Sequence, residues 1–240
     1  MIFTTGTLIL AAGVFLGFFT QTIVGFASAL VGFPFLLTQY NLQEATSFLS
    51  FYYIIFSIVL VYKNRKDTDK TVFKAIALPA AAGYLTGFLI LAAVSPIWLE
   101  KGLGVFVICY SIYEWNFKKT FRLPKILFNL LGFIGGVIGG IFSSGATFFA
   151  PVVGSRVKNG VVLRATLMAI FAIANFIRFP FVVATHLLTK RIFMESLILF
   201  PVFILALYVG HAVYKYISEQ LLRKLILVFL IISGVMFLVK

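Results

Sequence analysis

The chain carries an internal repeat, and this feature constrains its fold more than any single motif. The stretch Gly25-Phe26-Ala27-Ser28-Ala29 leads to Pro34, and Phe142-Ser143-Ser144-Gly145-Ala146 leads to Pro151 at the same spacing. Further pairs follow in order: Ala45-Thr46 with Ala165-Thr166, Pro79 with Pro201, and Gly87 with Gly210. Their offset drifts only from about 117 to about 123 residues, as loop insertions produce. The pattern predicts two related halves, repeat 1 at 7–116 and repeat 2 at 126–239.

Composition decides the solvent in which these halves fold. Hydrophobic residues make up 62% of the chain and charged residues 11%, too little polar surface for an ordinary soluble domain. Long apolar segments separated by polar turns indicate a helical bundle in a bilayer. We predict one membrane domain over 1–240, whose N-terminus stays in the first segment. The eight segments are Thr7–Leu37, Ala45–Tyr62, Phe73–Val94, Trp98–Trp115, Ile126–Val153, Leu163–Leu188, Ile192–Tyr214 and Leu221–Val239.

The first and fifth segments differ from the others. Each is longer than one crossing needs and is interrupted by small or polar residues, near Gly25 and Gly145. If both are re-entrant hairpins and the other six segments cross, the loops on one face hold 15 cations and those on the opposite face hold 4. If all eight cross, the split is 12 against 7, a poorer fit to the positive-inside rule. The distribution of loop cations therefore favours the topology with two re-entrant hairpins.

Three crossings per repeat place the second repeat upside down relative to the first. The predicted fold is all-α: a polytopic helical membrane protein with two inverted-topology repeats, each made of a broken re-entrant hairpin and three crossing helices. Such repeats bring broken helices together near the bilayer midplane, where transporters hold substrate. The sequence therefore indicates a transporter.

Arg178 stands apart from the other cations, which lie in loops or near segment ends. It is 14 residues from Arg164 and 12 from Lys190, and a guanidinium at that depth usually marks a pathway or a paired charge. Its fork of donors suits oxyanions. Asn175 lies one helical turn earlier as a neutral donor. The alternative is that Arg178 pairs with Glu114 or with carbonyls freed by Pro180.

The two hairpin tips are the second candidate feature. Helix starts near Gly25 and Gly145 direct backbone N–H groups and positive dipole ends at the midplane, which favours anions. Hydroxyl and amide donors flank them: Ser143, Ser144 and Thr147 in one hairpin, and Gln21, Thr22 and Ser28 in the other. The alternative is that small residues here only let helices approach closely. We expect the Gly132–Gly140 glycines to form a packing face.

Several other functions find little support. No basic helix face with interleaved aromatics indicates nucleic acid, and the cations follow the positive-inside rule. Cys109 is the single cysteine, so no internal disulfide or multi-cysteine metal site forms. Phosphate-loop and metalloprotease motifs are missing, and we expect no cofactor and no metal. An intramembrane serine hydrolase, with Ser143 or Ser144 opposite His186, has no support from spacing.

The repeated small-residue hairpins with Pro34 and Pro151, followed by Ala45-Thr46-Ser47 and Ala165-Thr166 and by the Pro79–Gly87 and Pro201–Gly210 pairs, resemble the TauE/SafE sulfite-exporter family. The resemblance covers nearly the whole chain, although the family commonly shows Gly-Ile-Gly-Gly-Gly at the hairpins. It implies a secondary transporter of small sulfur-containing anions, such as sulfite or sulfonates, in the bacterial plasma membrane. Related thiosulfate importers use cysteines along the path, and Cys109 is far from both hairpins in sequence.

The resulting prediction is a multi-pass permease whose partners are a small anion and membrane lipid, with self-association possible and no nucleic acid. Its substrate-binding residues are predicted to be Arg178, Asn175, Ser143, Ser144, Thr147, Gln21, Thr22 and Ser28. A lipid scramblase or lipid carrier remains the principal alternative, which a polar lateral groove would favour.

Overall fold

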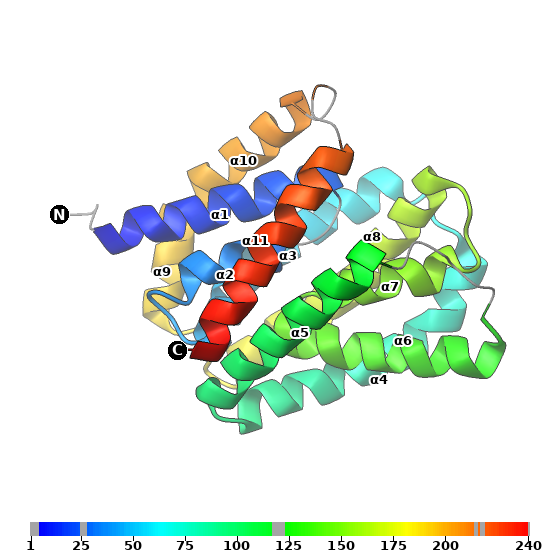
Figure 1. The fold of residues 1–240 in the computed structure, drawn as a ribbon, viewed down its shortest axis with the longest axis horizontal. Helices are drawn as coiled ribbons and strands as arrows, with labels where there is room; N and C mark the ends of the chain where they lie inside the picture. The colour runs from blue at the N-terminus through cyan, green and yellow to red at the C-terminus, as the bar shows by residue number, and fades with distance from the viewer. Residues whose placement is uncertain (1–4, 25–27, 117–122, 214–215, 217–218, 240) are drawn as a thin grey trace. The chain divides into compact units, whose positions relative to one another are not determined.

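The structure, a computed structural model, describes residues 5–24, 28–116, 123–213, 216 and 219–239. Over these residues the chain forms eleven α-helices and no strand (Figure 1). The helices are α1 Thr5–Val24, α2 Ser28–Leu36, α3 Leu42–Asn64, α4 Lys70–Ala93, α5 Pro96–Asn116, α6 Lys125–Phe142, α7 Gly145–Gly154, α8 Gly160–Ala184, α9 Lys190–Ile198, α10 Phe200–Val213 and α11 Glu219–Val239. The prediction of an all-α fold is confirmed.

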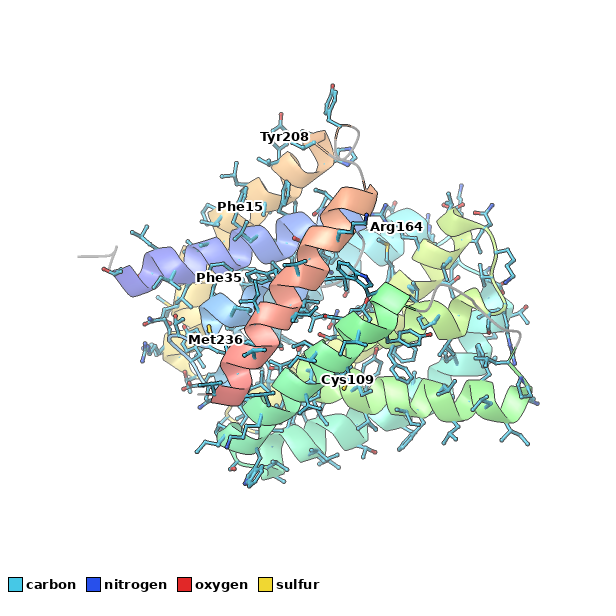
Figure 2. The ribbon with its side chains drawn as sticks, viewed as in Figure 1. Phe15, Phe35, Cys109, Arg164, Tyr208 and Met236 are labelled. Carbon is cyan, nitrogen blue, oxygen red and sulfur yellow. The ribbon has the colours of Figure 1, made fainter. Side chains whose placement is uncertain are left out.

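Five of the described helices are long and apolar enough to cross a membrane: α1, α3, α4, α6 and α8. The bent pair α9 and α10 makes a sixth if it counts as one span. Many large apolar side chains lie on the surface, among them Leu78 at 79% and Ile126 at 84% exposed. Figure 2 shows side chains such as Tyr208 and Met236 extending outward from their helices. A surface of this kind fits lipid better than water.

The chain forms two compact units, each of which draws helices from both predicted repeats. The first unit comprises Met1–Thr46, Val94–Lys118 and Lys190–Lys240. The second unit comprises Ser47–Ala93 and Lys119–Thr189. In the first unit, α1 of repeat 1 packs against α10 of repeat 2; in the second, α6 of repeat 2 packs against α4 of repeat 1.

In the first unit, α2 runs back along α1. A Cβ built on Gly17 would lie 2.7 Å from the Ser28 carbonyl, and one built on Gly6 would lie 2.7 Å from the Gln39 side chain. The chain has therefore returned by Gln39 to the level at which α1 begins. Because α1 ends at Val24 and α2 begins at Ser28, the predicted helix start near Gly25 lies outside the described residues.

In the second unit, α7 runs back along α6 in the same way. A Cβ on Gly139 would lie 2.9 Å from the Gly145 Cα, and the Arg156 guanidinium carbon lies 3.7 Å from the centre of the Phe128 ring. The helices break at Ser143 and Ser144, and α7 begins at Gly145 as the sequence predicts. Both broken segments thus form antiparallel helix pairs.

Glycine pairs bring α4 and α6 into close contact. A Cβ on Gly136 would lie 2.9 Å from the Gly83 Cα, and one on Gly140 would lie 2.8 Å from the Gly87 Cα. Distances below 3.0 Å leave no room for a side chain, so the predicted packing role of the α6 glycines is confirmed.

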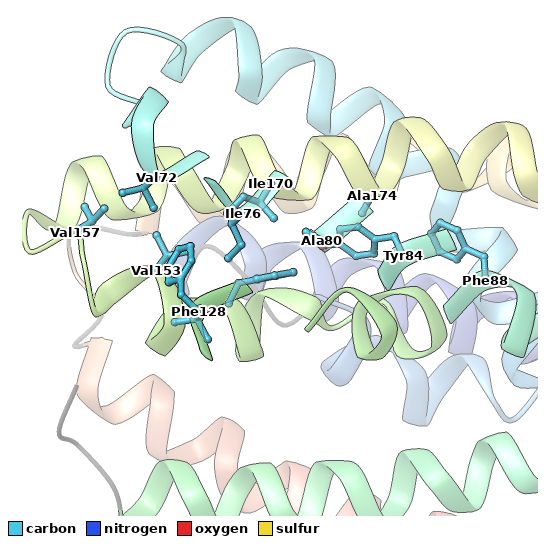
Figure 3. Close-up of a cluster of buried hydrophobic side chains, with 12 residues drawn as sticks. Val72, Ile76, Ala80, Tyr84, Phe88, Phe128, Val153, Val157, Ile170 and Ala174 are labelled. Atoms are coloured by element: carbon cyan, nitrogen blue, oxygen red, sulfur yellow. The ribbon is translucent and has the colours of Figure 1, made fainter. Parts of the chain in front are cut away.

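An apolar cluster along α4 completes the core of the second unit. It joins side chains of α4, α6, α7 and α8, and Figure 3 shows Tyr84 and Phe88 toward one end with Ala174 of α8 beside Tyr84. These residues hold α8 against α4.

The segment predicted at Ile192–Tyr214 contains a bend that the sequence analysis did not predict. The helices α9 and α10 meet at Leu199 with a bend of 46°. Pro201, at the second position of α10, has no N–H for the helical ladder, and its ring clashes with the carbonyl four residues earlier. By contrast, α4 continues through its matching Pro79.

Candidate functional site

Arg178 is the only charged side chain that is buried among the described residues, at 2% exposure. It lies in α8, 18 positions after the first residue of the helix, Gly160. The N-cap of this helix is Asn159, whose side chain accepts from the N–H groups of Val161 and Val162. The cap and a long apolar run fix the register of α8 and carry the guanidinium into the interior of the second unit. Burial of this charge is costly unless it is compensated.

Neutral acceptors hold the guanidinium in place. Its Nη1 donates to Ser143 Oγ at 2.8 Å, and its Nη2 donates to the Gly139 carbonyl at 2.7 Å. Gly139 lies in the last turn of α6, where carbonyls lack helical partners and the dipole is negative. Aromatic faces add weaker support, with the Phe88 ring centre 5.1 Å from the guanidinium carbon.

The second unit offers Arg178 little opportunity for an ion pair. Its sequence holds twelve Lys and Arg but only two acids, Asp67 and Asp69. Asp69 accepts hydrogen bonds from the N–H groups of Thr71 and Val72 at the start of α4. Both acids precede the first residue of α4, Lys70, whereas Tyr84, which lines the same cavity as Arg178, is 14 positions further along α4, about 21 Å. The two acids of this unit are therefore far from the guanidinium. The predicted alternative partner Glu114 has a side chain outside the described residues.

Ser143 occupies an unusual backbone conformation. It ends α6 with φ of 55°, in the left-handed region that non-glycine residues rarely adopt. This turn brings its hydroxyl to Arg178. Its neighbour Ser144 precedes α7 without capping it by its side chain, and its Oγ donates to the Phe142 carbonyl instead.

Asn175 lies on the same face of α8 as Arg178. Its Nδ2 donates to Ser57 Oγ of α3 at 2.8 Å. Both side chains line a small cavity of about 10 Å³, no more than the space of one water molecule. The structure therefore brings together Arg178, Asn175 and Ser143 of the predicted site.

The cavity also includes residues that the sequence reasoning missed. Its remaining lining consists of Tyr53, Tyr84, Gly139, Gly145, Phe171 and Ala174. Tyr84 lies between Pro79 and Gly87, two positions of the predicted repeat, and this position could have marked it as a candidate site residue. Tyr53 and Ser57 lie four positions apart in α3, but nothing in their local sequence sets them apart from other polar residues there.

The other predicted residues have different surroundings. The side chain of Thr147 lies outside the described residues. In the first unit, Gln21 and Ser28 are buried at the break between α1 and α2, and Thr22 Oγ1 donates to the Phe18 carbonyl. These three residues remain predicted site residues.

A separate polar cluster in the first unit lies beyond the hairpin. Tyr40 donates to Glu195, which also forms an ion pair with Arg191 at 3.1 Å. Burial and the Glu195 hydrogen bond raise the pKa of Tyr40 above its ordinary value. The contact ties the chain after α2 to α9. No group of three or more His, Cys, Asp or Glu side chains suited to a metal occurs in the described part of the chain.

A helical bundle with five or six apolar spans and a cation buried inside it defines a multi-pass membrane protein. The family model described as Sulfite exporter TauE/SafE matches residues 9–237, and the chain belongs to this family. The family consists of membrane transporters and not of enzymes, which removes the serine-hydrolase alternative. No curated protein and no solved structure matches the chain.

Proposed function

We propose that the chain is a secondary transporter of small organic or inorganic anions, such as sulfite or sulfonates, in the plasma membrane. The observation that carries this proposal is Arg178: a buried guanidinium held by two neutral oxygens, in a unit whose only two acids lie in the loop before α4. A positive charge left without a carboxylate attracts a negative solute into a site of low dielectric.

The hydrogen-bond donors around Arg178 support an anion as that solute. The Ser143 hydroxyl, which accepts from the guanidinium in this structure, has an O–H that can donate to an anion bound beside it. Asn175 lies beside it. We assign the same role of replacing hydration to Ser144 and Thr147, and to Gln21, Thr22 and Ser28 of the other hairpin.

The inverted repeat supplies the transport step. Each hairpin packs on the second crossing segment of the opposite repeat, α1 on α10 and α6 on α4, so the exchange is reciprocal. Reciprocal packing of this type suits two oppositely oriented repeats that rock and expose one site alternately. A membrane potential negative inside favours anion efflux by about 2.3 kcal/mol per charge per 100 mV, which is sufficient to drive export.

The test is uptake of radiolabelled sulfite, sulfonates, sulfate and carboxylates into proteoliposomes that hold equal amounts of protein. We expect Arg178→Leu to abolish anion flux and Arg178→Lys to retain part of it, because lysine keeps the charge but lacks the fork. Arg65→Leu, which removes an exposed loop cation, serves as the control and should leave flux unchanged. Undiminished flux in Arg178→Leu overturns the proposal.

Lipid flipping in the same vesicles tests the lipid-scramblase alternative. We expect the wild-type protein in these vesicles to transport anions without flipping lipids. Flipping without anion flux contradicts this expectation.

A further inference from the structure

Two buried donors beside the small cavity of the second unit lack a hydrogen-bond partner among the described residues. They are Arg178 Nε and Tyr84 Oη, and both residues line the same small cavity. Arg178 is 2% exposed and Tyr84 is 1% exposed. Buried donors normally find acceptors, so two that face one cavity indicate an absent acceptor.

The start of α7 adjoins the same cavity. The helix begins at Gly145, which lines the cavity, and Ser144 does not cap it with its side chain. A Cβ built on Gly145 would lie 3.0 Å from Tyr84 Oη, so the tyrosine hydroxyl reaches the helix start. The first N–H groups of a helix point outward and carry a positive partial charge.

We propose that Arg178 Nε, Tyr84 Oη and the start of α7 form one site for a singly charged oxyanion and that this site rejects doubly charged ones. The inference rests on the proposed function and specifies its substrate class. Sulfonates and hydrogensulfite belong to the accepted class, and sulfate belongs to the rejected class.

The charge balance of the site carries the selectivity. Arg178 is the only buried charged side chain that the structure describes, so one formal positive charge faces the anion. The other walls include Tyr53, Phe171 and Ala174, which bring no compensating charge. A monoanion leaves the site neutral. A dianion leaves one charge buried and unpaired, a costly arrangement in low dielectric.

Tyr84 supplies the second selective element. A phenol donates one hydrogen bond to an oxyanion without adding charge, so it strengthens binding of a monoanion and leaves the charge balance unaltered. Replacing it with phenylalanine removes this donor and retains the ring that packs against Phe88 and Phe149.

The site is closed around its donors in this structure. A cavity of about 10 Å³ holds about one water molecule, so an oxyanion enters only if a wall moves. Ser143 is the movable wall, because its Oγ occupies one guanidinium donor and its backbone has φ of 55°. The anion replaces Ser143 Oγ as the acceptor from Arg178.

The experiment measures uptake of methanesulfonate, which is singly charged, and of sulfate, which is doubly charged, by the full-length protein in proteoliposomes. Wild-type protein should transport methanesulfonate at least about a hundredfold more efficiently than sulfate. Tyr84→Phe should lower methanesulfonate uptake by about tenfold to a hundredfold, the effect of losing a hydrogen bond to a charged group. Tyr208→Phe, at an exposed tyrosine of α10, is the matched control.

The outcomes separate this inference from the proposed function. Equal uptake of both anions that is lost in Arg178→Leu overturns the selectivity and leaves the transporter intact. Uptake of neither anion, with other anions also excluded, overturns both. Unchanged methanesulfonate uptake in Tyr84→Phe removes Tyr84 from the site. Size-exclusion profiles and melting temperatures in detergent show that each variant is folded, and Tyr84→Leu supplies a second variant without a side-chain donor.

Discussion

The hairpins of the two units share an architecture and differ in charge. In each, a short helix runs back along a long one, α2 along α1 and α7 along α6. The first unit holds eight cations and five acids, and the polar side chains buried at its break are neutral. The second unit holds twelve cations and two acids and buries Arg178 beside its break. The two hairpins thus share a helical arrangement, and among the described residues the buried charge lies beside only one of them.

The helix that supports each hairpin shows a second difference. At the interface between α4 and α6, glycines of one helix pack directly against glycines of the other, as Gly83 does against Gly136. Between α10 and α1, Gly210 meets the side chain of Thr22. The second unit therefore holds its charged hairpin through backbone-to-backbone contact, whereas in the first unit the shortest contacts of Gly210 are with the Thr22 side chain, and the Phe19 carbonyl oxygen lies 3.3 Å away.

We expect the largest change in stability from glycine substitutions at these two interfaces. Gly136→Leu must displace the backbone of α4, so we expect a loss above about 3 kcal/mol or failure to fold. Gly210→Ala would place its Cβ 2.8 Å from Thr22 Cβ and 3.3 Å from the Phe19 carbonyl oxygen, a milder overlap, and should cost about 1 kcal/mol. Melting temperatures in detergent measure both, with Gly160→Ala as the control because its Cβ meets nothing within 4 Å. Equal losses at the two interfaces contradict the comparison.

The next effect tests whether the second unit needs its uncompensated charge. Asn175→Asp adds a carboxylate of the same shape one turn from Arg178, where it pairs with the guanidinium and competes with the anion. Anion uptake should fall by about tenfold to a hundredfold without loss of folding. Gln21→Glu, beside the break of the first hairpin, should reduce uptake less. A variant Asn175→Asp that transports as well as wild type shows that the charge of Arg178 is not what binds the anion.

A smaller effect concerns the turn at Ser143. Ser143→Ala and Ser143→Gly both remove the acceptor of the Arg178 hydrogen bond, but only glycine relaxes the left-handed backbone. Ser143→Gly should therefore be the more stable of the two by about 1 kcal/mol. Thermal unfolding of the purified variants gives this difference. If alanine proves equal or better, the turn carries no strain.

The smallest effect lies in the first unit. Tyr40→Phe removes the hydrogen bond to Glu195 and should cost about 1 kcal/mol with no change in anion uptake. The raised pKa of Tyr40 means that the folded protein holds the phenol proton more tightly than the unfolded chain. The contribution is therefore complete below the ordinary tyrosine pKa and is lost as pH rises beyond it. Melting temperatures of wild type and variant at neutral and alkaline pH should converge at high pH, and a constant difference contradicts the assignment.

Much of the fold followed from the sequence because helical periodicity and small-residue breaks are local signals. The break at Ser143 and Ser144 and the start of α7 at Gly145 were predicted from residue types alone. The bend at Leu199 was missed because Pro79 and Pro201 look equivalent in the repeat, yet one helix continues through its proline and the other begins beside it.

The site was predictable only in part. Arg178 could be found because a cation at that depth is rare, and its approach to the Ser143 hairpin is consistent with that reasoning. Tyr84 and Ser57 were missed because their importance comes from long-range contacts with α7 and α8. The alternative that Arg178 bonds to carbonyls freed by Pro180 differs from the contacts: the carbonyl that accepts from Arg178 Nη2 belongs to Gly139, at the end of α6.

The proposed function rests on contact between the Arg178 guanidinium and the transported anion. The decisive experiment is a structure of the protein in lipid nanodiscs with methanesulfonate present. We expect the sulfonate within hydrogen-bond distance of Arg178 Nε and Tyr84 Oη, with Ser143 Oγ displaced from the guanidinium. A guanidinium still bonded to Ser143 while the sulfonate lies elsewhere, or one paired with a carboxylate, contradicts the proposed function.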